Sequence, residues 1–162
     1  MRRLLFAGVV AVLGAAAAAC GSSSPTTVTG GHGPGDGHMS AMAAPPEGAI
    51  RVGLRNWSVD PAVTSVRAGK VAFWAVHEMD HAHGHDEGGQ VHDLQVLKKS
   101  GDGSWDLVGQ VRNLGMGEAA LLELNLEPGE YELACTVVEE TKSGVVSHYE
   151  KGMRTPFTVT GS

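Results

Sequence analysis

PGEYELACTVVEETKSGVVSHYEKGM, residues 128–153, brings a thiol, an imidazole and a thioether into one short segment. These three metal-binding side chains belong to Cys135, His148 and Met153. Tyr131 and Leu133 precede Cys135 at period two, so one face of a strand is predicted to carry all three into a core. Cys135 would then point inward at the end of that strand, and the histidine and methionine would follow in a loop before the last strand.

The first twenty residues predict export from the cytoplasm. A short basic start at residues 1–3 precedes an apolar run that ends at residue 19 and is too short to span a membrane comfortably. We therefore expect a signal peptide over residues 1–19. The run ends in Ala-Ala-Ala-Cys before glycine and serines, which resembles the lipobox of bacterial lipoproteins with Cys20 as the lipidated residue. Cleavage as an ordinary signal peptide, leaving Cys20 free, is the alternative.

A lipidated Cys20 leaves Cys135 without an intramolecular partner, because the chain has 2 cysteines. Extracytoplasmic proteins usually pair their cysteines in disulfides, so an unpaired thiol there must be bound or shielded in another way. Metal ligation is one solution. Simple burial is the other, since free cysteine packs well as a small hydrophobe, and the cysteine count alone favours burial.

Composition divides the mature chain into a tether and one domain. Residues 20–47 are rich in Gly, Ser, Thr, Pro, Ala and His, which predicts a flexible tether. Residues 48–162 are enough for a single domain with one core. The formal net charge of −6 argues against nucleic acid as a partner. We expect an extracytoplasmic monomer held by its lipid on the periplasmic or cell-surface side of the cell membrane.

Hydrophobic alternation predicts an all-β domain. Apolar and polar residues alternate in five segments separated by turn-forming residues, a pattern typical of a Greek-key β-sandwich or barrel. The five segments are residues 50–55, 71–76, 93–96, 122–126 and 157–160. Only residues 111–120 could hold a helical turn, and the two glycines there disfavour it.

His92 shares a strand face with Leu94 and Val96 in this pattern. A histidine in that place is more often a hydrogen-bonded core residue than a metal ligand. Yet His92 and Cys135 both fall at strand ends, where segments converge, and together with His148 and the methionine they provide two imidazoles, a thiolate and a thioether. That donor set matches a trigonal copper site with a weak axial methionine. Zinc remains an alternative metal for the same four groups, although a distant methionine is a poor ligand for tetrahedral zinc.

Four motifs of the domain resemble those of one family. They are VRAGKVAFWAVHEMD (66–80), VHDLQVL (91–97), LEPGEYELACTV (126–137) and SHYEKGMRTPFTV (147–159). They are similar to the strands and ligand segments of the cupredoxins, the family of plastocyanin and azurin. The resemblance implies a type 1 copper site whose ligands are His92, Cys135, His148 and Met153. It also implies that Asp93 and Thr136 lie where the family tethers the cysteine loop by a hydrogen bond.

Two segments depart from the family pattern. Twelve residues separate Cys135 from His148, more than in most of the family, and TKSG at 141–144 predicts a turn that would return His148 to the site. HEMDHAHGHDEGGQ at 77–90 interleaves histidines with carboxylates. This segment is either a solvated polar loop or a second, exchangeable site for copper(II) or zinc. Its candidate ligands are His77, His81, His83 and His85.

Three functional hypotheses follow. The resemblance, together with the lipobox, implies a membrane-tethered one-electron carrier that serves a redox partner such as a cytochrome or an oxidase. We expect no enzyme, because a copper ion with four ligands leaves no open position for a substrate. The histidine-rich loop favours instead an extracytoplasmic copper chaperone, scavenger or sensor. The long segment between Cys135 and His148 keeps open a structural cupredoxin-like module whose metal site is incidental.

Overall fold

The computed structural model describes residues 39–40, 44–79 and 89–161. The chain divides into two units, Met1–Gly33 and Pro34–Ser162, and all the described residues belong to the second. In this described part, no helix has the length and apolar character needed to cross a membrane. The signal peptide and Cys20 lie outside the described residues.

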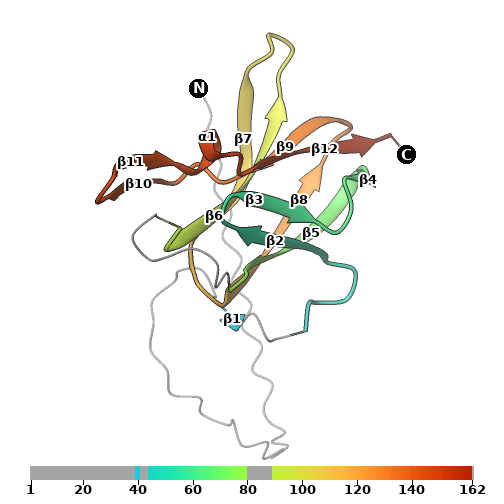
Figure 1. The fold of residues 1–162 in the computed structure, drawn as a ribbon. Helices are drawn as coiled ribbons and strands as arrows, with labels where there is room; N and C mark the ends of the chain where they lie inside the picture. Colours follow the sequence, from blue (N-terminus) through green and yellow to red (C-terminus); the bar gives the residue numbers. More distant parts are fainter. Residues whose placement is uncertain (1–38, 41–43, 80–88, 162) are drawn as a thin grey trace, which may run out of the picture. The chain divides into compact units, whose positions relative to one another are not determined.

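Two five-stranded sheets and a separate hairpin form the domain (Figure 1). The first sheet contains, in spatial order, β1 (Met39–Ser40), β8 (Glu118–Leu126), β5 (Gly69–His77), β2 (Ile50–Arg55) and β3 (Ser58–Pro61). The second contains β4 (Ser65–Arg67), β12 (Arg154–Thr160), β9 (Gly129–Ala134), β6 (Val91–Lys99) and β7 (Trp105–Gly115). The pairs β2–β5 and β4–β12 are parallel and the other pairs are antiparallel, so both sheets are mixed.

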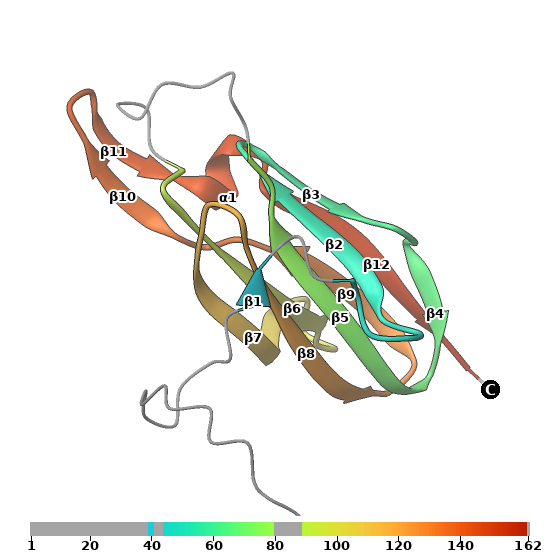
Figure 2. The same cartoon turned by 90° about the horizontal axis from the view of Figure 1, so that it is seen from below.

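The two sheets pack face to face around one main core, which confirms the predicted β-sandwich (Figure 2). Phe73 of β5 and Phe157 of β12 contact edge to face across the sheets, with ring centroids 5.5 Å apart. Each of the five segments with predicted alternation lies in a strand: β2, β5, β6, β8 and β12. Inward residues of these strands bury apolar area, which is the main stabilising contribution to such a core.

Residues 111–120 hold no helical turn, which corrects the one helical possibility of the sequence. They end β7 and begin β8, with a tight turn at Met116 and Gly117 between the strands. Gly117 has a φ of 76°, a left-handed conformation that glycine adopts without steric cost. The glycines that weakened the helix therefore belong to a hairpin.

The segment between Cys135 and His148 forms a β-hairpin of its own. Strands β10 (Val138–Thr141) and β11 (Gly144–Ser147) pair with each other as a two-stranded sheet. The hairpin projects away from the two large sheets in both views (Figures 1 and 2). Its turn lies at the TKSG segment, where the Thr141 hydroxyl donates to the Gly144 carbonyl at 2.8 Å. The predicted excursion of the chain is thereby confirmed.

A short helix, α1 (His148–Lys151), follows this hairpin directly. The hydroxyl of Ser147 caps its N-terminus by accepting from the Glu150 N–H at 3.4 Å. Gly152 ends it with a φ of 114°, so the chain turns at once into Met153 and β12.

One part of the predicted tether joins the first sheet. Met39 and Ser40 form β1 and pair antiparallel with Ala119 and Glu118 of β8. Without β1, β8 would be an edge strand with unpaired backbone groups, and such an edge can pair with an additional strand. Composition alone carries no signal for this pairing.

Candidate metal centre

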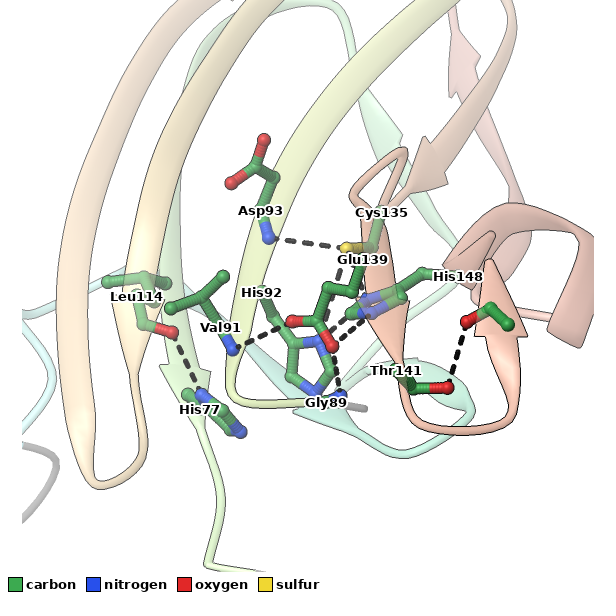
Figure 3. A network of polar contacts seen from close by, with 11 residues as sticks. His77, Gly89, Val91, His92, Asp93, Leu114, Cys135, Glu139, Thr141 and His148 are labelled. Atoms are coloured by element: carbon green, nitrogen blue, oxygen red, sulfur yellow. Dashed lines mark hydrogen bonds and ion pairs between the residues drawn. The ribbon is translucent and has the colours of Figure 1, made fainter. Parts of the chain in front are cut away.

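Three buried ligand atoms converge where β5 and β9 end and β6 begins (Figure 3). Nδ1 of His92 lies 3.2 Å from Nδ1 of His148. The sulfur of Cys135 lies 3.4 Å from the same His148 atom and 4.0 Å from Nδ1 of His92. All three side chains are 0 % exposed. The structure therefore brings together three of the four predicted ligands, which are far apart in the sequence.

Backbone hydrogen bonds fix the segment that carries Cys135, His148 and Met153. The Cys135 N–H donates to the Met153 carbonyl at 2.9 Å, and the Met153 N–H donates to the His148 carbonyl at 3.0 Å. The His148 N–H donates to Val137 at 3.0 Å. Met153 is fully buried in the main core beside these bonds. Its role as an axial ligand stays a prediction.

The separations of the three atoms are compatible with one shared metal ion. Metal–nitrogen and metal–sulfur bonds are about 2.1 and 2.3 Å in zinc sites, so two atoms on one ion lie at most about 4.2 Å apart for two nitrogens and about 4.4 Å for nitrogen and sulfur. The distances of 3.2, 3.4 and 4.0 Å are all shorter than these limits. His92, Cys135 and His148 could thus hold a single ion.

Burial keeps both imidazoles neutral and the thiol protonated when no metal is bound. It lowers the pKa of His92 to about 3, with smaller contributions from the neighbouring imidazoles of His77 and His148. Burial also lowers the pKa of His148, against the opposing effect of Glu139. The pKa of Cys135 is raised to about 11, chiefly by burial. A metal ion could therefore bind the neutral imidazoles without the release of a proton from a charged ring, but it would displace one proton from the thiol.

Asp93 contacts Cys135 through its backbone and not through its carboxylate. The Asp93 N–H lies 3.3 Å from the Cys135 sulfur, where it can stabilise a thiolate. The carboxylate instead accepts from the Asn113 N–H at 2.8 Å, and the side chain of Thr136 is exposed. The side-chain tether expected between Asp93 and Thr136 is therefore replaced by a different contact.

A β-bulge explains the direction of the Asp93 carboxylate. His92 pairs with Leu114 but Leu94 pairs with Val111, so two residues of β7 face Asp93. One of these two is Asn113, whose φ of 56° presents its N–H to the carboxylate.

His77 lies beside the metal centre and not in a polar loop, which corrects its predicted place. It is the last residue of β5, is 2 % exposed, and its ring centroid is 4.2 Å from that of His92. The strand pairs with β2 as far as Leu54 and His77, which carries this histidine inward. The other three candidates, His81, His83 and His85, lie outside the described residues, so a second metal site stays a prediction.

Two residues of the centre were missed by the sequence analysis. The Trp57 ring contacts the His148 ring edge to face at 5.1 Å between centroids. One carboxylate oxygen of Glu139 lies 3.6 Å from Nε2 of His148. Trp57 lies in the turn between β2 and β3, and Glu139 lies in a strand without clear alternation. No local sequence pattern therefore indicated that either residue lies at the centre.

Comparison with known proteins found likenesses only among solved structures. No family model matches the chain, and no curated protein matches it. A reduced amicyanin mutant is 15% identical with a TM-score of 0.44, and the match covers 78% of this chain and 94% of that one. Amicyanin from Paracoccus versutus (Thiobacillus versutus) is 19% identical with a TM-score of 0.41, over 75% of this chain and 90% of that one. A copper(I) form of another amicyanin mutant is 16% identical with a TM-score of 0.40, over 78% and 94%.

The class of the domain follows from its own architecture. Two mixed sheets form a sandwich, and a buried His-Cys-His group lies where strands of both sheets end. The long segment between the cysteine and the second histidine folds into a hairpin that leaves this arrangement intact. The domain is a β-sandwich of two mixed sheets with a buried His-Cys-His group, as the sequence predicted.

Proposed function

We propose that this protein is a cupredoxin that binds one copper ion and carries single electrons. The ligands are His92, Cys135 and His148, with Met153 as a weak axial ligand. The supporting observation is that two imidazole nitrogens and one thiol sulfur meet within 4.0 Å of one another at a fully buried point. When bound, copper would supply a reversible change between its two oxidation states.

The chemistry of the donors favours copper over zinc. Thiolate and thioether are soft ligands that suit copper(I), and imidazole suits both oxidation states. Among the described residues, three side chains that could be strong metal ligands converge here: His92, Cys135 and His148. A structural zinc site normally uses four such ligands in a tetrahedron, so zinc would lack one strong ligand.

The chain contributes a rigid, dry frame around the ligands. Backbone hydrogen bonds of 2.9–3.0 Å join Cys135 to Met153 and Met153 to His148. The N–H of Asp93 points to the sulfur, and the three ligand side chains are closed off from water. Ligands that are held in one geometry need little rearrangement when the charge at the site changes, and this property suits an electron carrier.

The carrier is proposed to be tethered to a membrane outside the cytoplasm. The basic start, the short apolar run and the Ala-Ala-Ala-Cys sequence support a signal peptide with lipid on Cys20. Because Met39 and Ser40 pair with β8, the free tether would comprise residues 20–38, and a coil of that length would reach roughly 25 Å from its anchor. Loss of Arg2 and Arg3 with the leader takes the formal charge from −6 to −8, which favours a redox partner with a basic docking surface. We expect a cytochrome or oxidase partner and a monomeric carrier.

Copper loading of the mature chain tests this function. One copper ion per chain, with an intense thiolate-to-copper absorption band and reversible reduction, is the expected result. Several weakly coloured copper ions per chain would favour the chaperone, scavenger or sensor. A folded chain that binds no copper would favour the structural module and contradict the proposal.

A further inference from the structure

The Glu139 carboxylate joins the segments that carry the two histidine ligands (Figure 3). One oxygen accepts from the Gly89 N–H at 2.7 Å, and the other lies 3.4 Å from the Val91 N–H. The first oxygen also lies 3.6 Å from Nε2 of His148. The side chain is only 15% exposed, so these contacts are shielded from solvent.

These contacts hold the projecting hairpin against the sandwich. Strands β10 and β11 pair only with each other in the described part of the chain, so no sheet hydrogen bonds fix the hairpin to either large sheet. Glu139 supplies a link of another kind, because Gly89 and Val91 lead directly into His92. The carboxylate therefore ties the position of the hairpin to the start of β6.

His148 has a polar atom that requires such an acceptor. Its Nε2 is buried and has no hydrogen-bond partner among the described residues. When Nδ1 of a neutral imidazole binds a metal, the ring proton must lie on Nε2, which then becomes a donor. A carboxylate oxygen of Glu139 lies 3.6 Å from this atom, which is slightly longer than a hydrogen bond.

We propose that Glu139 is a positioning residue of the metal centre. It accepts the Nε2 proton of His148, so that Nδ1 is presented to the metal, and it holds the hairpin against the segment that precedes His92. Its negative charge lies close to a ligand and favours the more positive oxidation state of the metal, which lowers the reduction potential. This inference rests on the proposed function, since it concerns the same copper site.

The test compares Glu139→Gln with Glu140→Gln in the mature chain. Both changes remove one negative charge from β10 at nearly constant volume, but the side chain of Glu140 is exposed. We expect Glu139→Gln to weaken copper(II) binding about 10–100-fold, as loss of an outer partner of a metal-bound histidine does, and to raise the reduction potential. Glu140→Gln should leave the affinity and the potential close to the wild-type values.

A metal-free measurement tests the same contacts without copper. Amide hydrogen exchange at Gly89 or Val91 should accelerate in Glu139→Gln and stay unchanged in Glu140→Gln, because the Gln side chain has one acceptor oxygen where the Glu139 carboxylate has two. If Glu139→Gln does not fold, Glu139→Asp replaces it, since the shorter acid keeps the charge but cannot reach all three partners. The Asp variant should then bind copper more weakly than the wild-type chain. Its reduction potential should change little, because the negative charge is kept.

The outcomes separate this inference from the proposed function. A wild-type chain without one coloured copper ion would overturn both. A wild-type chain with that copper, but with equal effects of the two Gln variants or no effect of either, would overturn the role of Glu139 alone. Equal effects would mean that the net charge of the hairpin matters and that the contacts of Glu139 do not.

Discussion

The imidazole of His77 packs against that of His92, with ring centroids 4.2 Å apart and ring planes tilted by 49°. Nδ1 of His77 lies 2.9 Å from the carbonyl oxygen of Leu114 and donates its proton there, since a carbonyl can only accept. His77 therefore ties the end of β5 to β7 and packs directly beside the first ligand.

Replacement of His77 by Phe separates packing from ligation. Phe keeps a ring beside His92 but leaves the buried Leu114 carbonyl without its donor. We expect the coloured copper to remain and the free energy of unfolding of the metal-free protein to fall by about 1–3 kcal/mol. Urea denaturation and the absorption spectrum measure the two effects. Loss of the colour in a folded variant would mean that His77 itself is a ligand.

Cys135→Ser should abolish the thiolate-to-copper absorption band and leave a folded sandwich. The hydroxyl is nearly the size of the thiol but does not supply a soft thiolate, and the band arises from that sulfur. Cys20→Ser, made in a chain that is not lipidated, is the matched control, because it removes the other cysteine and should keep the band. Absorption spectroscopy after copper loading decides, and a Cys135→Ser protein with the wild-type band would contradict the assignment.

Met153→Leu should keep copper bound and raise the reduction potential. A weak axial thioether tunes the potential more than it holds the metal, and its removal favours copper(I). Leu replaces a fully buried Met at a cost below about 1.5 kcal/mol, so the fold should persist. Met116→Leu, in the exposed turn between β7 and β8, serves as the control for voltammetry. Loss of most copper affinity in Met153→Leu would show that the thioether is a principal ligand.

The metal-free protein should lose stability as the pH falls below about 6.5. His92 has a pKa of about 3 in the fold and 6.5 as its ordinary value, so between these values the unfolded chain binds more protons and is favoured. From pH 7 to pH 5 this one group should lower the free energy of unfolding by about 2 kcal/mol. The lowered pKa values of His77 and His148 act in the same direction.

Urea denaturation of the metal-free chain at pH 7 and pH 5 measures this loss. His92→Gln should show a smaller difference between the two pH values, because it lacks the titrating ring. An unfolding free energy that is equal at both pH values in the wild-type chain would contradict the burial of neutral imidazoles.

Much of the fold could be predicted because it depends on local patterns. Period-two alternation identified segments of β2, β5, β6, β8 and β12, and the TKSG segment marked the hairpin turn. The convergence of His92 and Cys135 could be anticipated because each falls at an inward position near a strand end, and His148 was assigned to the site because it follows Cys135 in a segment that resembles a family motif. These features need only the sequence around each residue.

The remaining contacts depend on how distant segments meet. The exact end of β5 decides that His77 is buried, and it is set by pairing with β2. A bulge opposite Asp93 turns its carboxylate toward Asn113, although the family resemblance implied a hydrogen bond to the cysteine loop. Glu139 contacts Gly89 because the hairpin projects in one particular direction. No local pattern encodes these relations.

The histidine-rich loop provides the last prediction. His81, His83 and His85 alternate with alanine and glycine, which predicts a loop able to wrap a metal ion. Replacing all three with Ala should leave the coloured copper unchanged, because His92 lies on β6 and the two other ligands lie far along the chain. It should remove a second equivalent of copper(II) or zinc. Protons compete with the metal for imidazole nitrogens, so this second equivalent should weaken as the pH falls toward 6.

Isothermal titration of the wild-type and triple-mutant chains at pH 7 and pH 5.5 measures both effects. The second equivalent should be present only in the wild-type chain, and it should weaken strongly at pH 5.5 because protons compete for the imidazoles. The coloured equivalent should be equal in the two chains, since its imidazoles are buried and resist protonation. One equivalent in both chains at both pH values would show that the loop is a solvated connection, and the chaperone hypothesis would then lose its main support.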